Sequence, residues 1–256
     1  MNQVYVYAKG QTIDGYARLH YYSWQILRQF FGVTTISQRV VEAYVGEYAS
    51  GKSECAVNRA VELACQGRQV TLVDLDIVEP CYTLRPIQDE LRAAGVDVIA
   101  WETRRTMGLG EAGTLLKPQA RWALHRSGDV IFDVGYGVAG ARTLNLVEGA
   151  AQDPDLVVLA VINASRPMTA SVEDIVEHVR SLGRVDGLIN NTHLAEETTP
   201  EVVQEGARLV AAAARILGLP VVATTALAEV AAVIGPRDAM GHPVRPIKRY
   251  MPRAFW

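Results

Sequence analysis

The eight residues Gly46-Glu47-Tyr48-Ala49-Ser50-Gly51-Lys52-Ser53 have the residue types and spacing of a loop that holds phosphate groups. Glycines at the two ends let the backbone curve until several N–H groups point at one anion. The Lys52 ammonium then reaches the outer phosphates, and the Ser53 hydroxyl is placed to bind Mg²⁺. The stretch predicts binding of a nucleoside triphosphate. The expected cofactor-binding residues here are Gly46, Tyr48, Ala49, Ser50, Gly51, Lys52, Ser53 and Glu54.

The flanking residues supply the elements that this loop requires. Residues 40–45 are a short β-branched and apolar run, which is typical of a buried parallel strand. Residues 53–66 place their apolar side chains on one helical face, and Gly67 follows as a stop. A helix that begins at the loop adds the partial positive charge of its N-terminus to the phosphate site.

The same alternation of apolar runs and helical patterns continues along the chain. It predicts an α/β fold, a doubly wound and mostly parallel sheet with helices on both faces, in one domain of residues 40–235. The expected strands are 40–45, 69–76, 96–101, 129–134, 156–163, 187–191 and 220–224. The clearest expected helices are 53–66, 171–182 and 200–217, with a further helical stretch at 141–151.

Acidic residues follow two of these expected strands. Parallel sheets bind ligands at the carboxyl ends of their strands, so side chains there are candidates for chemistry. Asp76 is placed to orient a water molecule or to hold Mg²⁺ through water, while Asp74 fits a structural hydrogen bond equally well. Asp133, with Gly135 two residues later, resembles the acid that supports Mg²⁺ and the glycine that senses the terminal phosphate. We therefore expect Lys52, Asp76 and Asp133 to be catalytic and Ser53, Asp76 and Asp133 to serve the metal.

Two amides end the strand expected at 187–191. An Asn side chain carries a donor and an acceptor and suits the edge of adenine, so Asn190 and Asn191 are expected near the base, with Thr225 beside it. The guanine-selective pattern Asn-Lys-x-Asp is absent from the sequence. ATP is therefore expected in preference to GTP, together with Mg²⁺.

These motifs, in this order, resemble those of the MinD/ParA/CobQ-like P-loop ATPases, a group that includes the nitrogenase iron protein. The resemblance spans about residues 40–227. It implies that Asp76 handles the attacking water, that Asp133 supports Mg²⁺ and that Asn191 contacts adenine. It also implies a homodimer, or a nucleotide-dependent dimer, that uses hydrolysis as a switch.

One position departs from the family pattern. Many members carry a second lysine directly after the first loop glycine, and this chain has Glu47 there. An acid repels phosphate, so hydrolysis is expected to be slow, activated by a partner or assisted by another cation. Arg104 and Arg105 are candidates for that cation, although an ordinary solvated pair fits them better.

Other functions fit the same motifs. A small-molecule kinase or ligase of the same fold and a nucleotide sensor that does not hydrolyse ATP are the alternatives to an ATPase switch. Two G-x-G-x-x-G patterns, at 108–113 and 135–140, also suggest a dinucleotide site. The strand after the second pattern ends without the acid that binds a ribose, which disfavours NAD(P). The five histidines lack metal-ligand spacing. His193, just past Asn191, is expected at the surface, with a place in the lining of the site as the alternative.

The two ends of the chain differ from the middle. Residues 1–39 hold eight of the eighteen aromatic residues, and 16–31 fit a helix packed on the domain's own surface or, alternatively, a docking element for a protein partner. Residues 236–256 are basic and contain three prolines, which predicts a separate solvated tail without membrane contact.

The composition agrees with a globular protein. With 49% hydrophobic and 21% charged residues the chain can build a core, and a net charge of −3 gives no general attraction to nucleic acid. The sequence has no apolar run of membrane-spanning length and no signal-peptide pattern. Three cysteines without close pairing suit a reducing compartment, so we expect a cytoplasmic protein.

Overall fold

The computed structural model describes residues 7–8, 11–12, 38–77, 84–101 and 116–250. The chain divides into two compact units, Met1–Gln38 and Arg39–Trp256. In the first unit, β1 (Tyr7–Ala8) and β2 (Gln11–Thr12) form an antiparallel pair. The helix expected at 16–31 lies outside the described residues, as do Arg104, Arg105, the glycine pattern 108–113 and the last six residues of the chain.

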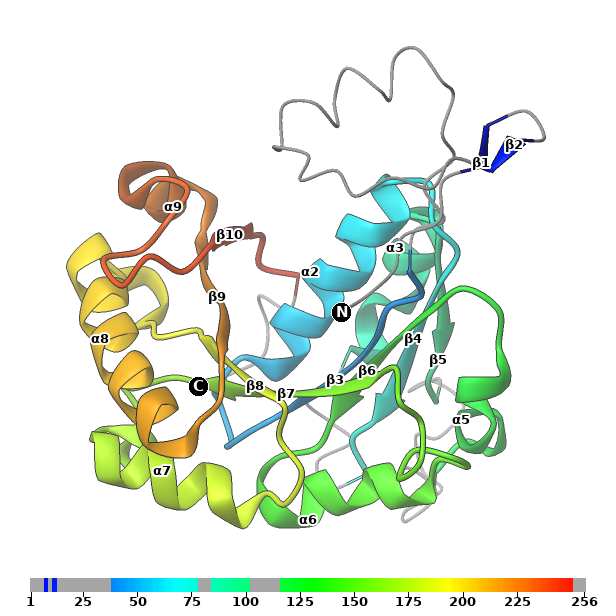
Figure 1. Cartoon of the computed structure of the whole chain (residues 1–256), viewed down its shortest axis with the longest axis horizontal. Coiled ribbons are helices and arrows are strands. Elements are labelled where there is room, and N and C mark those ends of the chain that lie inside the picture. Colours follow the sequence, from blue (N-terminus) through cyan, green and yellow to red (C-terminus); the bar gives the residue numbers. More distant parts are fainter. Residues whose placement is uncertain (1–6, 9–10, 13–37, 78–83, 102–115, 251–256) are drawn as a thin grey trace. The chain divides into compact units, whose positions relative to one another are not determined.

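A parallel sheet is the centre of the second unit (Figure 1). Eight described strands form it in the order β10-β9-β8-β7-β3-β6-β4-β5, and every pairing is parallel. The strands are β3 (Val41–Val45), β4 (Val70–Leu75), β5 (Val96–Ile99), β6 (Asp129–Val134), β7 (Leu156–Ile162), β8 (Gly187–Asn190), β9 (Val221–Leu227) and β10 (Val244–Ile247). The predicted α/β fold class is confirmed.

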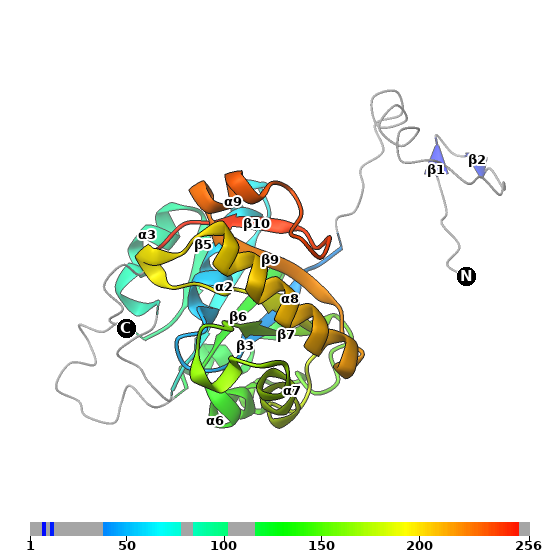
Figure 2. The same cartoon turned by 90° about the vertical axis from the view of Figure 1, so that its left-hand side faces the viewer.

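Helices connect the strands and cover both faces of the sheet. The α-helices in the described residues are α2 (Lys52–Cys65), α3 (Gln88–Ala93), α5 (Pro118–Arg121), α6 (Gly137–Ala141), α7 (Val172–Ser181), α8 (Pro200–Leu217) and α9 (Ala228–Ile234). Short 3-10 segments lie at Arg85–Ile87, Ala123–His125, Arg142–Leu146, Pro167–Thr169 and Ala195–Glu197. Figure 2 shows the same elements after a quarter turn.

Successive side chains along each strand point to opposite faces of the sheet and pack into two apolar layers, one on each face. In β6, Val130, Phe132 and Val134 pack into the layer under α7 and α8, whereas Ile131 packs into the layer under α2 and α3. Each strand is therefore covered on both sides, which explains why the strands appear in the sequence as nearly continuous apolar runs. Burial of both faces fixes the register of β3, and so the position of the loop that follows it.

Two expectations about local structure are wrong. Residues 244–247 do not belong to a separate solvated tail, because they form β10 and pair with β9 from Thr224 to Leu227. Pro246 is tolerated there since β10 lies at the edge of the sheet. The helical stretch expected at 141–151 is instead the short helix α6, ending at Ala141, followed by the 3-10 segment Arg142–Leu146.

No helix in the described residues combines the length and the apolar character needed to cross a membrane.

Candidate nucleotide site

The loop between β3 and α2 curves through residues in the left-handed region of backbone space. Gly46 has φ 144°, Ala49 57° and Gly51 88°. At Gly46 a Cβ would lie 2.5 Å from the carbonyl oxygen of Val161, so the loop also needs glycine to pass close to β7. Left-handed residues interspersed in a short loop direct neighbouring N–H groups to one side, which is the arrangement of an anion nest.

Lys52, the first residue of α2, is folded back onto this loop. Its Nζ donates a hydrogen bond to the carbonyl oxygen of Glu47 at 2.9 Å, and only 8% of the residue is exposed. Burial lowers the pKa of Lys52, and the nearby carboxylates of Asp133, Asp76 and Glu47 oppose that change. Among the described residues the ammonium thus has one hydrogen-bond partner, a carbonyl oxygen that phosphate oxygens can replace.

Asp133, in β6, is a buried carboxylate at the same end of the sheet. It is 1% exposed, and neither oxygen makes a well-formed hydrogen bond within the described residues. Burial raises the pKa of Asp133 well above its ordinary value; Asp74 and Asp76 add to this effect, while the Ser53 hydroxyl and Lys52 counteract it. A buried carboxylate without hydrogen bonds needs a cation or a proton, so this group fits a site that takes up a metal ion.

The described residues contain no cluster of three or more His, Cys, Asp or Glu side chains able to enclose a metal ion. Mg²⁺ does not require such a cage, since it is commonly bound by one or two protein oxygens together with waters and phosphates. Ser53 and Asp133 provide that kind of donor set.

Asp74 and Asp76 have different surroundings. Asp74 is paired in register with Asp133 and makes a buried ion pair with Arg85, whose Nε donates to Oδ2 at 2.7 Å. The same two side chains hold the backbone of Asp76: its N–H donates to Asp74 Oδ1 at 2.9 Å, and its carbonyl accepts from Arg85 at 3.0 Å. The structural hydrogen bond expected for Asp74 is therefore confirmed, and Arg85 is a positioning residue that carried no signal in the sequence.

Gly135 begins a second loop beside the first. The N–H of Gly137 donates to the carbonyl oxygen of Gly46 at 2.9 Å, which joins the two loops. The ring of Tyr136 meets the ring of Tyr48 edge to face, with centroids 5.5 Å apart. Gly135 therefore lies next to the first loop, as the sequence predicted from its position after Asp133.

Asn191 ties the end of β8 to the phosphate loop. Its Nδ2 donates to the carbonyl oxygen of Ser50 at 2.7 Å, and its Oδ1 accepts from the Thr225 hydroxyl at 2.7 Å. Within the part of the chain that the structure describes, one N–H and one lone pair of the amide remain for a ligand. The Ser50 hydroxyl is buried without a partner in the described residues.

Asn190, which is expected to bind the cofactor, does not line the pocket described below. It is fully buried, and its Nδ2 donates to the carbonyl oxygen of Val203 at 3.1 Å. Successive side chains along a strand point to opposite faces, so two adjacent asparagines cannot both face the same ligand. The Asn190 side chain is therefore engaged inside the protein, away from the pocket that Asn191 lines.

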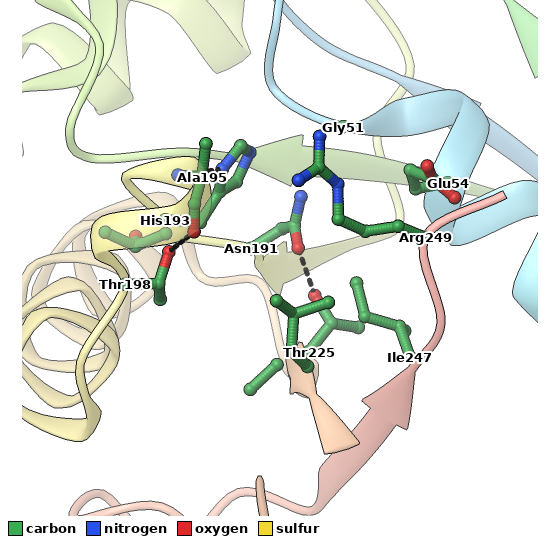
Figure 3. Close-up of a pocket in the computed structure, with 12 residues that line it drawn as sticks. Gly51, Glu54, Asn191, His193, Ala195, Thr198, Thr225, Ile247 and Arg249 are labelled. Carbon is green, nitrogen blue, oxygen red and sulfur yellow. Dashed lines mark hydrogen bonds between the residues drawn. The ribbon is translucent and has the colours of Figure 1, made fainter. Parts of the chain in front are cut away.

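A pocket opens beside Gly51 and Asn191 (Figure 3). Its described lining also includes Glu54, Thr225, His193, Ile247 and Arg249. His193, expected at the surface, is largely enclosed, and burial lowers its pKa to about 4, with Arg166 and Arg249 adding to the effect. Glu54 is used internally: both of its carboxylate oxygens accept from the Tyr250 amide, at 3.1 and 3.0 Å.

Glu47, the departure from the family pattern, lies between the loop and α7. One of its oxygens accepts from the Tyr48 N–H at 2.8 Å, and the other lies 3.7 Å from Nδ1 of His178. Burial lowers the pKa of His178, with Glu47 opposing and Lys52 adding to that effect. The carboxylate is thus held at the surface of the loop and adds negative charge beside the expected phosphates.

The fold and the loop define a class of protein, the α/β proteins with the P-loop nucleoside triphosphatase fold. Solved structures with this fold are similar to the chain. The signal recognition particle receptor FtsY from Elizabethkingia anophelis in complex with GDP has a TM-score of 0.52 at 17% identity, covering 75% of this chain and 58% of that one. FtsY from Thermotoga maritima has a TM-score of 0.49 at 20% identity, covering 78% and 68%.

The 54 kDa signal recognition particle protein from Aeropyrum pernix in complex with GDP is similar over 77% of this chain and 45% of its own, with a TM-score of 0.47 at 20% identity. This chain therefore spans about half to two thirds of the length of these proteins. At such identities the likeness concerns the fold alone. No family model matches the chain, and no curated protein matches it in sequence.

Proposed function

We propose that the protein binds Mg²⁺-ATP at the loop Gly46–Ser53 and hydrolyses it slowly as a conformational switch. The observation that carries this proposal is the Lys52 ammonium folded back onto an anion nest, within electrostatic influence of the buried Asp133 carboxylate, which has no well-formed hydrogen bond in the described residues. This combination of a buried base, a buried acid and left-handed loop residues costs stability, and it makes sense at a site for a metal and polyphosphate.

The roles of the residues follow from their positions. Lys52 exchanges its bond to the Glu47 carbonyl for the outer phosphate oxygens. The Ser53 hydroxyl and the Asp133 carboxylate would hold the metal. Mg²⁺, when bound, supplies charge neutralisation for the phosphates. Asp76, whose backbone is fixed by Asp74 and Arg85, orients the attacking water.

ATP is proposed as the nucleotide because of what lines the pocket. Guanine presents N–H donors at N1 and N2 and needs a strong acceptor, usually a carboxylate. Among the described lining residues Glu54 is the one carboxylate, and the Tyr250 N–H, shared between its two oxygens, holds it against the segment after β10. The solved structure of the Elizabethkingia protein holds GDP, so GTP is the competitor that an experiment must include.

The switch is proposed to act through dimerisation, as the resemblance to the MinD/ParA/CobQ-like P-loop ATPases would imply. Glu47 replaces the lysine with which many such proteins reach the partner's nucleotide, so hydrolysis should stay slow until a partner supplies a cation. Residues 1–39 are the proposed docking element for such a partner.

Calorimetric titration of the full chain with ATP and GTP, each with Mg²⁺, tests the proposal. We expect ATP to bind with a higher affinity than GTP, and Lys52→Ala to abolish binding of both. Sedimentation with a non-hydrolysable ATP analogue then reports dimerisation, and phosphate release reports turnover. Unchanged ATP affinity in Lys52→Ala would overturn the proposal.

A further inference from the structure

The segment that follows β10 is fastened to the first half of α2 by two side chains. Asn58 donates from Nδ2 to the carbonyl oxygen of Lys248 and accepts at Oδ1 from the Lys248 N–H, both at 2.8 Å. One turn earlier on α2, Glu54 accepts from the Tyr250 N–H. The Asn58 amide thus donates to and accepts from the backbone of one residue, as the backbone of an adjacent β-strand does. Together with Glu54 it fixes residues 248–250 beside the phosphate loop.

This attachment determines which side chain faces the pocket. Lys248 and Tyr250 lie together, with the Nζ of Lys248 4.9 Å from the centre of the Tyr250 ring. Arg249, between them, lines the pocket with Ile247. Figure 3 shows its side chain reaching over Asn191 toward the side of the pocket that holds His193.

The pocket contains a planar cation, the Arg249 guanidinium, and an uncharged hydrogen-bond donor, the His193 ring. His193 is uncharged at neutral pH, because its pKa is lowered to about 4. Its Nδ1 accepts from the Ala195 N–H at 3.3 Å, so the proton of the neutral ring is on Nε2. A Cβ added to Gly51 would lie 3.8 Å from that Nε2, which puts the donor at the edge of the phosphate loop. These groups fit a planar, nitrogen-rich ring attached to the phosphates.

We propose that Arg249 is a base-binding residue that stacks its guanidinium on the nucleobase, with His193 Nε2–H as a donor to a ring nitrogen. The proposal rests on the proposed function, because it assigns the base of the same nucleotide. Arg249 has Glu196 as its ion-pair partner, and the Glu196 side chain is 85% exposed. The Arg249 side chain is 28% exposed, and the pair is open to solvent at its Glu196 end. An ion pair with one partner in solvent contributes little, so Arg249 can exchange it for the face of an aromatic ring.

The test compares ligands with and without a base. Calorimetry on the full chain would measure Mg²⁺-ATP, Mg²⁺-GTP and Mg²⁺-tripolyphosphate with the wild type, Arg249→Ala and Lys248→Ala. Lys248→Ala is the matched control. It removes the same charge from the preceding residue, and the Lys248 side chain is 71% exposed. We expect Arg249→Ala to weaken ATP about tenfold, the effect of losing one stacked cation, and to leave tripolyphosphate unchanged. Lys248→Ala should change neither.

The outcomes separate this inference from the proposed function. Equal weakening of ATP and tripolyphosphate by Arg249→Ala would overturn stacking and make Arg249 a phosphate-binding charge; unchanged ATP affinity would overturn its role altogether. A wild type that binds none of the three ligands would overturn the proposed function as well. Asn58→Ala tests the attachment from outside the pocket. It should weaken ATP but not tripolyphosphate, and unchanged ATP affinity there would show that the attachment does not position Arg249.

Discussion

Asn191 and Gly51 depend on each other. The amide of Asn191 reaches the phosphate loop to donate to the Ser50 carbonyl at 2.7 Å, and a Cβ on Gly51 would lie 2.1 Å from the same nitrogen. Only glycine therefore allows this hydrogen bond, in addition to the φ of 88° that it adopts. The second glycine of the motif, which the sequence associates with phosphate, also serves the contact between the loop and the end of β8.

Replacement of Asn191 by Asp tests this contact. The change keeps the acceptor for the Thr225 hydroxyl but puts a buried oxygen opposite the Ser50 carbonyl. We expect the free energy of unfolding to fall by about 1–3 kcal/mol, the cost of an unsatisfied buried group. Urea denaturation measures it, with Thr225→Val as the companion that removes the other bond. A loss below about 0.5 kcal/mol would mean that the loop does not depend on this amide.

Gly140 is expected to be intolerant of any side chain. A Cβ there would lie 1.9 Å from the carbonyl oxygen of Gly135, a backbone atom that cannot rotate away. Gly140→Ala should therefore displace the Gly135 loop and destabilise the protein by about 1–3 kcal/mol or more. Ala139→Ser, on the exposed side of the same short helix, is the control. Thermal unfolding and ATP affinity should both change in the first variant, and equal behaviour of the two would refute the close approach.

The sequence predicts the sheet well because strands covered on both faces must be nearly all apolar. It does not predict β10, since an edge strand with Arg245 and Pro246 lacks that pattern. The motif identifies Lys52 and Ser53 by type and spacing. Which of two adjacent asparagines faces the loop depends on the strand's orientation, and the sequence does not encode it locally. Arg85 and Arg249 were not predicted because their contacts join segments far apart in the chain.

The buried pair of Asp74 and Arg85 should be costly to break from either side. Their side chains are 1% and 3% exposed, so Asp74→Ala removes the carboxylate that offsets the charge of a buried guanidinium. We expect a loss of about 3–5 kcal/mol, and a smaller loss for the double variant Asp74→Leu with Arg85→Met, which removes both charges. A double-mutant cycle by denaturation measures the coupling. Additive losses would show that the two side chains act independently.

His193 should make the protein less stable in mild acid. Its pKa is about 4 in the folded chain and near the ordinary value of 6.5 when unfolded. As the pH falls through this window the unfolded chain takes up the proton first, so stability is fully present above pH 6.5 and declines toward pH 4. His193→Gln cannot bind that proton, and should become more stable relative to the wild type by about 1–3 kcal/mol across the window. Urea denaturation at a series of pH values measures the difference.

Arg249 contributes to the lowered pKa of His193, so Arg249→Ala should raise that pKa in the folded chain. The pH range over which stability declines should then end at a higher pH than in the wild type. An unchanged difference between wild type and His193→Gln from pH 7 to 4 would show that the imidazole is not enclosed as the structure describes.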